Sequence, residues 1–102
     1  MRLERYPAGK LKKEIKEILK KYLGSRKYQA FFFGSRVSGK GNERSDIDLG
    51  IEGLKPFPSE IVSKIREEIV NLPFLYRVDV VDFNTVEGKF KKIAKEKIEL
   101  IN

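Results

Sequence analysis

The sequence predicts an α/β domain in which helices flank a small mixed β-sheet. Two stretches carry apolar residues at helical spacing, and three short apolar runs are typical of strands. The first two runs are joined without a long helix, whereas the second and third are joined through one. Because the chain has 102 residues, 40% of them hydrophobic, we expect one domain over residues 1–102 with a modest core.

The N-terminal third is predicted to hold a helix and a buried strand. From Lys10 to Leu23, apolar residues recur on one helical face, and lysines and glutamates fill the other. Gly24 fits a C-terminal cap of this helix. Tyr28 to Phe33 predicts a strand whose consecutive apolar residues indicate a central position, covered on both faces.

The second strand is expected at Ile47 to Glu52. It follows a loop at residues 35–45 that has room for one helical turn near residues 36–38. Alternation along the strand divides its side chains between two faces, with Ile47, Leu49 and Ile51 on one and Asp46, Asp48, Gly50 and Glu52 on the other.

A second long helix and a third strand follow. Ser59 is expected to cap a helix that ends near Leu72, just before Pro73. Arg77 to Phe83 is the third predicted strand. Strands joined by a short loop pair antiparallel, and strands joined through a helix can pair parallel, so we expect a mixed sheet.

The C-terminal segment is predicted to be a short helix with an apolar tail. Asn84 or Thr85 is expected to cap this helix, which would run to about Lys95. Residues 98–101 fit either a small final strand or the end of the helix.

Composition excludes several kinds of chemistry. The chain has no cysteine and no histidine, so any metal must be held by oxygen ligands, which hard cations such as Mg²⁺ prefer. The net charge of +7 fits a polyanionic partner, but a lysine-rich solvated surface explains it equally well. No apolar run approaches a membrane span and no signal-peptide core is visible, so we expect a cytoplasmic protein.

Two aspartates at the start of the second strand are candidate metal ligands. Asp46 and Asp48 are two residues apart, so their carboxylates leave the same face, about 6–7 Å apart at Cα. Carboxylates that close repel each other unless a proton or a cation lies between them. An isolated pair also fits a solvated strand edge, so the assignment depends on a further ligand.

The third strand offers that ligand. Asp79 lies among three valines, where a carboxylate is poorly placed unless it is paired or bound to a metal. Asp82 faces the opposite side and stands near the next helix, where it can cap that helix or face solvent. We therefore select Asp79 to join Asp46 and Asp48. Three such carboxylates could hold two Mg²⁺ ions, or Mn²⁺, for in-line displacement at phosphorus.

The loop between the first two strands has the composition of a phosphate-binding loop. Gly34 and Ser35 directly follow a buried strand and can present backbone N–H groups and a hydroxyl to phosphate. The similar Walker A pattern is disfavoured, because Gly41 stands where Ser or Thr should follow the lysine and the loop leads into a strand. The loop also carries three candidate cationic partners for phosphate: Arg36, Lys40 and Arg44.

Together, the loop and the aspartates resemble the polymerase-beta-type nucleotidyltransferase superfamily. The resemblance is carried by Gly34-Ser35, a gap of ten residues, Asp46-Ile47-Asp48 and the later Val78-Asp79-Val80-Val81. On a chain this short, the pattern is similar to the minimal nucleotidyltransferases, the MntA-like proteins, which are commonly encoded beside HEPN-domain proteins as toxin–antitoxin pairs. It covers the chain from about Tyr28 to the C-terminus.

The resemblance implies a role for each matched position. Gly34 and Ser35 would hold the triphosphate of a nucleotide. Asp46 and Asp48 would ligate Mg²⁺, and Asp79 would be the third carboxylate, helping to activate the acceptor hydroxyl. The resemblance further implies ATP as the donor and transfer of AMP to a hydroxyl, typically of a tyrosine, on a partner HEPN toxin.

Two expectations complete the functional hypothesis. Gly50, next after Asp48 on the same face, would leave open space beside the metals for the nucleotide. A chain of this length is expected to lack a domain that positions the acceptor, so a docked partner protein or an assembly would supply it. Two alternatives stay open: a non-catalytic antitoxin or nucleotide-binding module acting by contact with its partner, and a nucleic-acid-binding domain, which is less favoured because no such motif is present.

Overall fold

The computed structural model describes residues 1, 3–42, 44–74 and 76–102, and it confirms the predicted α/β architecture. Residue 43 of the predicted loop lies outside the described residues. The elements in chain order are α1 (Ala8–Leu23), β1 (Tyr28–Phe33), α2 (Ser35–Ser38), β2 (Ile47–Gly53), α3 (Ser59–Val70), β3 (Val78–Asp82), α4 (Gly88–Ala94) and β4 (Glu99–Leu100). In the ranges just given, no helix combines the length and the apolar character needed to cross a membrane.

The four strands form one mixed sheet in the order β3-β2-β1-β4. β1 pairs antiparallel with β2 and with β4, while β2 and β3 pair in parallel. Both predicted pairings are therefore confirmed, as the short loop and the intervening helix α3 require. The C-terminal tail is a strand, because Leu100 stands opposite Phe31 of β1.

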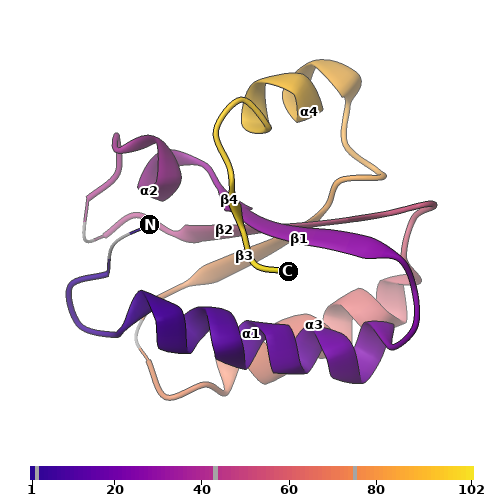
Figure 1. The fold of residues 1–102 in the computed structure, drawn as a ribbon, viewed down its shortest axis with the longest axis horizontal. Coiled ribbons are helices and arrows are strands. Elements are labelled where there is room, and N and C mark those ends of the chain that lie inside the picture. The colour runs from indigo at the N-terminus through magenta and orange to yellow at the C-terminus, as the bar shows by residue number, and fades with distance from the viewer. Residues whose placement is uncertain (2, 43, 75) are drawn as a thin grey trace.

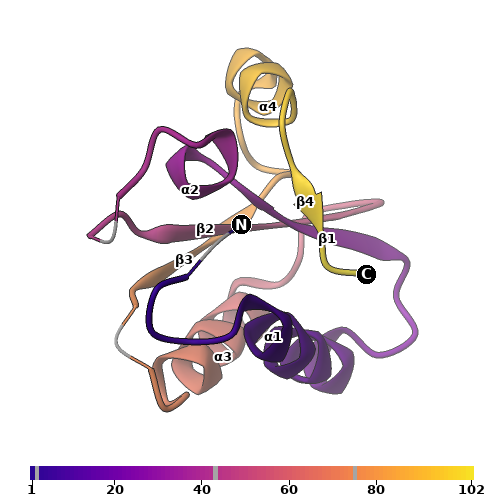
Figure 2. The same ribbon diagram turned by 60° about the vertical axis from the view of Figure 1, so that its left-hand side comes forward.

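The main core lies between the sheet and the helices α1 and α3, which run side by side across one face (Figure 1). The apolar stripe of α1 and the inward residues of β2 are buried in this core, as their spacing predicts. Both views place α2 and α4 on the opposite side of the sheet (Figure 1 and Figure 2). The buried core residues contributed by β2 are Ile47, Leu49 and Ile51.

A second, aromatic cluster fills the other face of the sheet. It consists of Phe31, Phe33 and Phe83, which meet ring edge to ring face or tilted at 4.9–6.1 Å between centroids. This cluster overturns the expectation that Gly50 leaves space for a nucleotide. A Cβ at Gly50 would lie 2.5 Å from the ring of Phe31 and 2.8 Å from that of Phe83. Glycine is needed there because the two rings already occupy the space beside the backbone.

The predicted N-caps of α3 and α4 are wrong. Pro58 takes the N-cap position of α3 and Ser59 is its first helical residue, while Glu87 takes the N-cap position of α4. Asn84 instead joins two distant turns, accepting a hydrogen bond from the Gly53 N–H at 2.8 Å and donating one to its carbonyl at 2.9 Å. The Asn84 side chain thus satisfies backbone groups that the fold brings near it, which a local capping rule does not consider.

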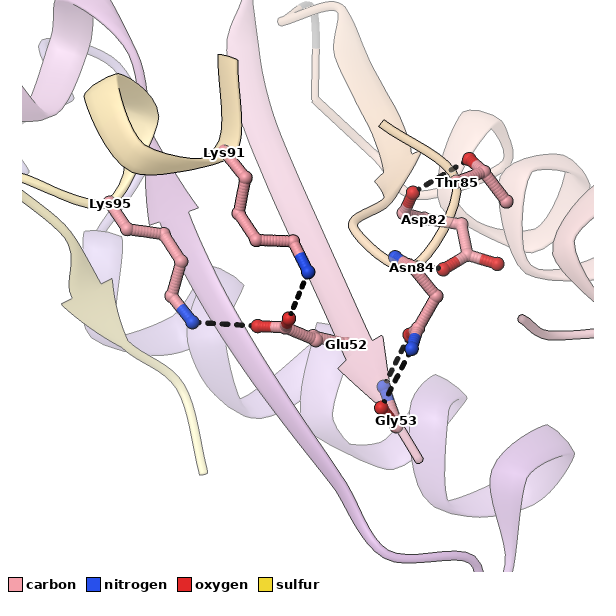
Figure 3. Close-up of polar contacts among 7 residues, drawn as sticks. All are labelled: Glu52, Gly53, Asp82, Asn84, Thr85, Lys91 and Lys95. Carbon is pink, nitrogen blue, oxygen red and sulfur yellow. Dashed lines mark hydrogen bonds and ion pairs between the residues drawn. The ribbon is translucent and has the colours of Figure 1, made fainter. Parts of the chain in front are cut away.

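Asp82 is buried rather than turned to solvent. Its carboxylate accepts hydrogen bonds from the backbone N–H groups of Phe57 and Asn84, both at 2.9 Å. Its carbonyl accepts a hydrogen bond from the Thr85 hydroxyl, and Figure 3 shows this bond together with the one from Asn84. A carboxylate with two N–H donors can be buried at low cost. Asp82 thus closes the turn after β3, on the opposite side of the strand from Asp79 as parity predicted.

Candidate active site

Two predicted metal ligands occupy paired positions on adjacent strands. Asp48 of β2 and Asp79 of β3 are partners in the parallel register. On its other side, Asp48 pairs with Phe33, the last residue of β1. Gly34 and the loop that follows therefore begin directly beside the two carboxylates.

A cavity of about 540 Å³ opens at this point. It brings together four residues that the sequence identified, namely Gly34, Lys40, Asp48 and Asp79. Its volume falls within the range of small-molecule sites in proteins. The remaining lining residues are Phe33, Ser38, Val81, Phe90, Ile93, Ala94, Glu96 and Lys97.

Gly34 allows the loop to pass close to the carboxylate of Asp48. Its backbone has φ +81° and ψ −162°, a conformation essentially restricted to glycine. A Cβ on Gly34 would lie 3.0 Å from Cγ of Asp48 and closer still to its Oδ2. The glycine is therefore required twice, once by its backbone conformation and once by the neighbouring side chain.

Backbone hydrogen bonds close the loop on itself after Gly34. The carbonyl of Ser35 accepts the N–H groups of Lys40 at 3.1 Å and Gly41 at 2.9 Å, and the hydroxyl of Ser38 at 3.2 Å. The helical turn expected near residues 36–38 is present as α2. This closure returns the chain toward its start, so that Lys40 lines the same cavity as Gly34.

The electrostatics of Asp48 favour a proton or a cation. Burial raises the pKa of the Asp48 carboxyl, and the charges of Asp79 and Asp46 raise it further. Asp79 itself is exposed, because β3 is an edge strand and its side chain is open to the cavity, rather than buried among the valines. Two oxygen ligands of like charge in one cavity fit the donor set of Mg²⁺.

The structure does not bring Asp46 fully into this arrangement. Its side chain is 49% exposed and its Oδ2 lies 3.9 Å from Nε of Arg77. Within the described residues, no three acidic side chains gather into a group that could hold a metal ion. The geometry thus assembles two of the three predicted carboxylates.

The two arginines of the loop lie outside the cavity. The side chain of Arg36 is 3% exposed, its Nε donates a hydrogen bond of 2.6 Å to the carbonyl of Ser45, and its guanidinium lies 4.8 Å from the ring centroid of Tyr76. Its Nη1 also lies 3.7 Å from Glu4. Arg36 therefore holds the base of the loop, while Arg44 lines a separate pocket.

Sequence reasoning missed the contribution of α4. Phe90 and Ile93 line the cavity, and Lys97 follows them. The two apolar residues are three positions apart, the spacing that places side chains on one face of a helix. That signal was visible, but only the fold reveals that this face reaches the carboxylates.

The structure thus places a glycine-dependent loop beside paired carboxylates on a mixed sheet, as the resemblance implied. Residues 13–102 match the family model described as polymerase beta, nucleotidyltransferase, and the chain belongs to that family. The resemblance predicted from the loop and the aspartates is confirmed.

The chain is also similar to particular members of the family. Over 69 residues it is 32% identical to a probable protein adenylyltransferase MntA of Haemophilus influenzae, a match that covers 68% of this chain and 60% of that protein. The chain thus spans about three fifths of the length of this curated relative.

Solved structures share the fold. A toxin–antitoxin crystallised with AMP-PNP matches with a TM-score of 0.72 at 15% identity, over 89% of this chain and 72% of that one. A complex of the tri-AMPylated Shewanella oneidensis HEPN toxin with its MNT antitoxin matches with a TM-score of 0.68 at 13% identity, over 90% and 69%. At this level of identity, the likeness concerns the fold.

Proposed function

We propose that this chain is a Mg²⁺-dependent nucleotidyltransferase that transfers AMP from ATP to a hydroxyl group of a partner protein. The observation that carries the proposal is the pairing of Asp48 with Asp79 in one cavity with Gly34 and Lys40. Negative ligands for a cation and a positive side chain for phosphate are the two requirements of a metal–nucleotide site.

Asp48 and Asp79 would hold the metal. The raised pKa of Asp48 reflects a like-charge environment that a divalent cation would relieve. Asp46 remains the candidate third ligand, since its only described ion pair is long and solvent-exposed and such a pair costs little to break. When bound, Mg²⁺ would offset the negative charge that develops on the phosphate oxygens during transfer.

The chain's own groups would position the donor and accept a proton. The loop after Gly34 and the ammonium of Lys40 would bind the triphosphate. The acceptor oxygen would bond to the α-phosphorus as the bond from that phosphorus to the bridging oxygen breaks and pyrophosphate leaves. The hydroxyl proton would pass to the carboxylate of Asp79, which is exposed and within the cavity.

The acceptor we propose is a HEPN-domain toxin, with this chain as its antitoxin. Support comes from the similarity to a probable protein adenylyltransferase MntA and from the shared fold with a toxin–antitoxin complex whose HEPN toxin is tri-AMPylated. A hydroxyl on a docked protein would supply the acceptor for the transferred AMP.

Intact-mass spectrometry tests reaction, donor and acceptor together. The chain is incubated with ATP, Mg²⁺ and a candidate HEPN-domain partner protein from the same organism, and this partner is expected to gain the mass of one or more AMP groups. Asp48→Asn and Asp79→Asn are expected to abolish the gain. Glu60→Gln, an exposed carboxylate on α3, is the matched control and should retain it. Equal labelling by all four proteins would refute the proposal.

A non-catalytic antitoxin is the alternative. It is favoured by the position of Asp46, whose side chain is directed to Arg77 instead of joining the other carboxylates. In that case Asp48→Asn and Asp79→Asn would still neutralise the toxin in a growth assay, without any change in the partner's mass.

A further inference from the structure

An apolar wall stands in the same cavity as the charged residues. Phe90 and Ile93 of α4 line it, yet they are 46% and 58% exposed, unusually high for large hydrophobic side chains. Exposed apolar groups inside a concave site indicate contact with an apolar part of a ligand.

The ring of Phe90 is held in place from behind. Its centroid lies 6.0 Å from that of Phe83 at 45°, and 6.3 Å from that of Phe33 at 87°. Both partners belong to the buried aromatic cluster on this face of the sheet. Phe90 therefore presents a rigid ring, with one part packed and another part open to the cavity.

Helix α4 is itself tied to the sheet by a carboxylate clamp. Glu52 of β2 bonds Nζ of Lys91 at 2.8 Å and Nζ of Lys95 at 2.6 Å, one lysine to each carboxylate oxygen (Figure 3). The side chain of Glu52 is only 20% exposed. Two ion pairs one helical turn apart hold one face of α4 against β2, and they favour the observed position of Phe90.

The cavity is thus lined by two chemically different sets of side chains. One set carries charges of both signs, suited to a metal and a phosphate chain, while Phe90 of α4 supplies an aromatic face. The charged residues are Lys40, Asp48, Asp79, Glu96 and Lys97. A nucleoside triphosphate has the same division, with a charged chain at one end and a flat base at the other. An aromatic ring recognises any base by stacking, and the strength of stacking grows with the area of the base.

We propose that Phe90 is the stacking platform for the nucleobase, so that the site binds purine nucleoside triphosphates more tightly than pyrimidine ones, and both more tightly than inorganic triphosphate. This inference rests on the proposed function. It assigns a role in nucleobase binding to the α4 residues of the cavity, which the proposed roles of the carboxylates and the loop leave without a function.

Calorimetric titration of the full chain with three probes in the presence of Mg²⁺ tests the proposal. The probes are ATP, CTP and inorganic triphosphate. Phe90→Ala is expected to weaken ATP binding roughly tenfold, CTP binding less, and triphosphate binding not at all. Leu54→Ala is the control, because this exposed leucine directly follows the end of β2, away from the strand start where Asp48 lies. It should leave the binding of all three probes unchanged.

Two further variants separate the loss of stacking from a loss of packing. Phe90→Leu keeps apolar contact with Phe33 and Phe83 but removes the aromatic face, and it is expected to weaken ATP binding while leaving triphosphate binding unchanged. Phe90→Trp enlarges the face and should retain ATP binding. This rescue by an aromatic residue is not expected of a merely structural role.

The outcomes separate this inference from the proposed function. If the wild type binds neither ATP nor triphosphate, both the proposed function and the platform fail. If the wild type binds both and Phe90→Ala weakens them equally, or weakens neither, the platform alone is refuted.

Discussion

Replacing Gly34 with alanine is expected to damage stability and metal binding together. The residue has φ +81° and ψ −162°, in a region that costs a non-glycine residue roughly 1–3 kcal/mol. In a domain of about this size, each 1 kcal/mol lowers Tm by about 4–8 °C. We therefore expect Gly34→Ala to unfold roughly 5–20 °C below the wild type.

The effect on metal binding has a separate cause. The new methyl group would lie 3.0 Å from Cγ and 3.3 Å from Cβ of Asp48, and closer to Oδ2, so the carboxylate must rotate away from its place beside Asp79. Rotation about side-chain bonds is feasible, but it separates the paired ligands. Mg²⁺ and ATP should raise the free energy of unfolding of the wild type, by about 2.7 kcal/mol when the ligand is at a hundred times its Kd. In Gly34→Ala this stabilisation, and the rise in Tm that it causes, should disappear.

Gly24→Ala, at the C-terminal end of α1 and outside the cavity, supplies the matched control. Gly24 also has a positive φ, +55°, but an added Cβ would have nothing within 4 Å. It should lose roughly 1–3 kcal/mol through backbone strain alone and keep its response to Mg²⁺ and ATP. Thermal and urea denaturation, each with and without the ligands, measure both effects. The reasoning is refuted if Gly34→Ala keeps the ligand response, or if its stability equals that of the wild type.

Three further substitutions test other parts of the structure. Burial, with the charges of Asp79 and Asp46, raises the pKa of Asp48 above its ordinary 3.8. The free energy of unfolding therefore falls as pH rises from 3.8 through the raised pKa, because the folded state loses a proton that it binds more tightly than the unfolded state does. At pH 7 without Mg²⁺, Asp48→Asn should have a modestly higher Tm than the wild type, and a lower Tm would contradict this. Burial opposes the charge of Glu52, but the hydrogen bonds from its two lysine partners outweigh burial and hold its pKa below 4.5. Glu52→Gln should therefore cost roughly 1 kcal/mol above pH 4.5, and urea titrations of the two proteins should converge as pH falls through the lowered pKa; a constant difference would exclude the clamp. Gly50→Ala should lose roughly 1–3 kcal/mol by overpacking against the two phenylalanine rings, and an unchanged urea midpoint would show that the rings yield freely.

The sequence alone predicted three strands of the sheet, the directions in which they pair and the aspartates that line the cavity. The period of two in β2 places Ile47 and Asp48 on opposite faces whatever packs against them, because successive side chains of a strand alternate. The lengths of the connections decide which strands pair antiparallel and which parallel. These features depend on local backbone geometry and on connection lengths, both of which can be read directly from the sequence.

Only the tertiary structure decided what surrounds those residues. Whether Gly50 opens onto space depends on Phe83, whether Arg36 reaches a phosphate depends on Tyr76, and the role of Asn84 depends on Gly53. Each of these pairs is separated by more than thirty residues, so no periodicity or capping rule connects its members. The same holds for α4, which the Glu52 clamp brings to the carboxylates from the far end of the chain. Contacts between distant segments arise from packing the whole chain, and they determine the shape of the site. Local sequence patterns identified candidate ligands but not the residues that surround them.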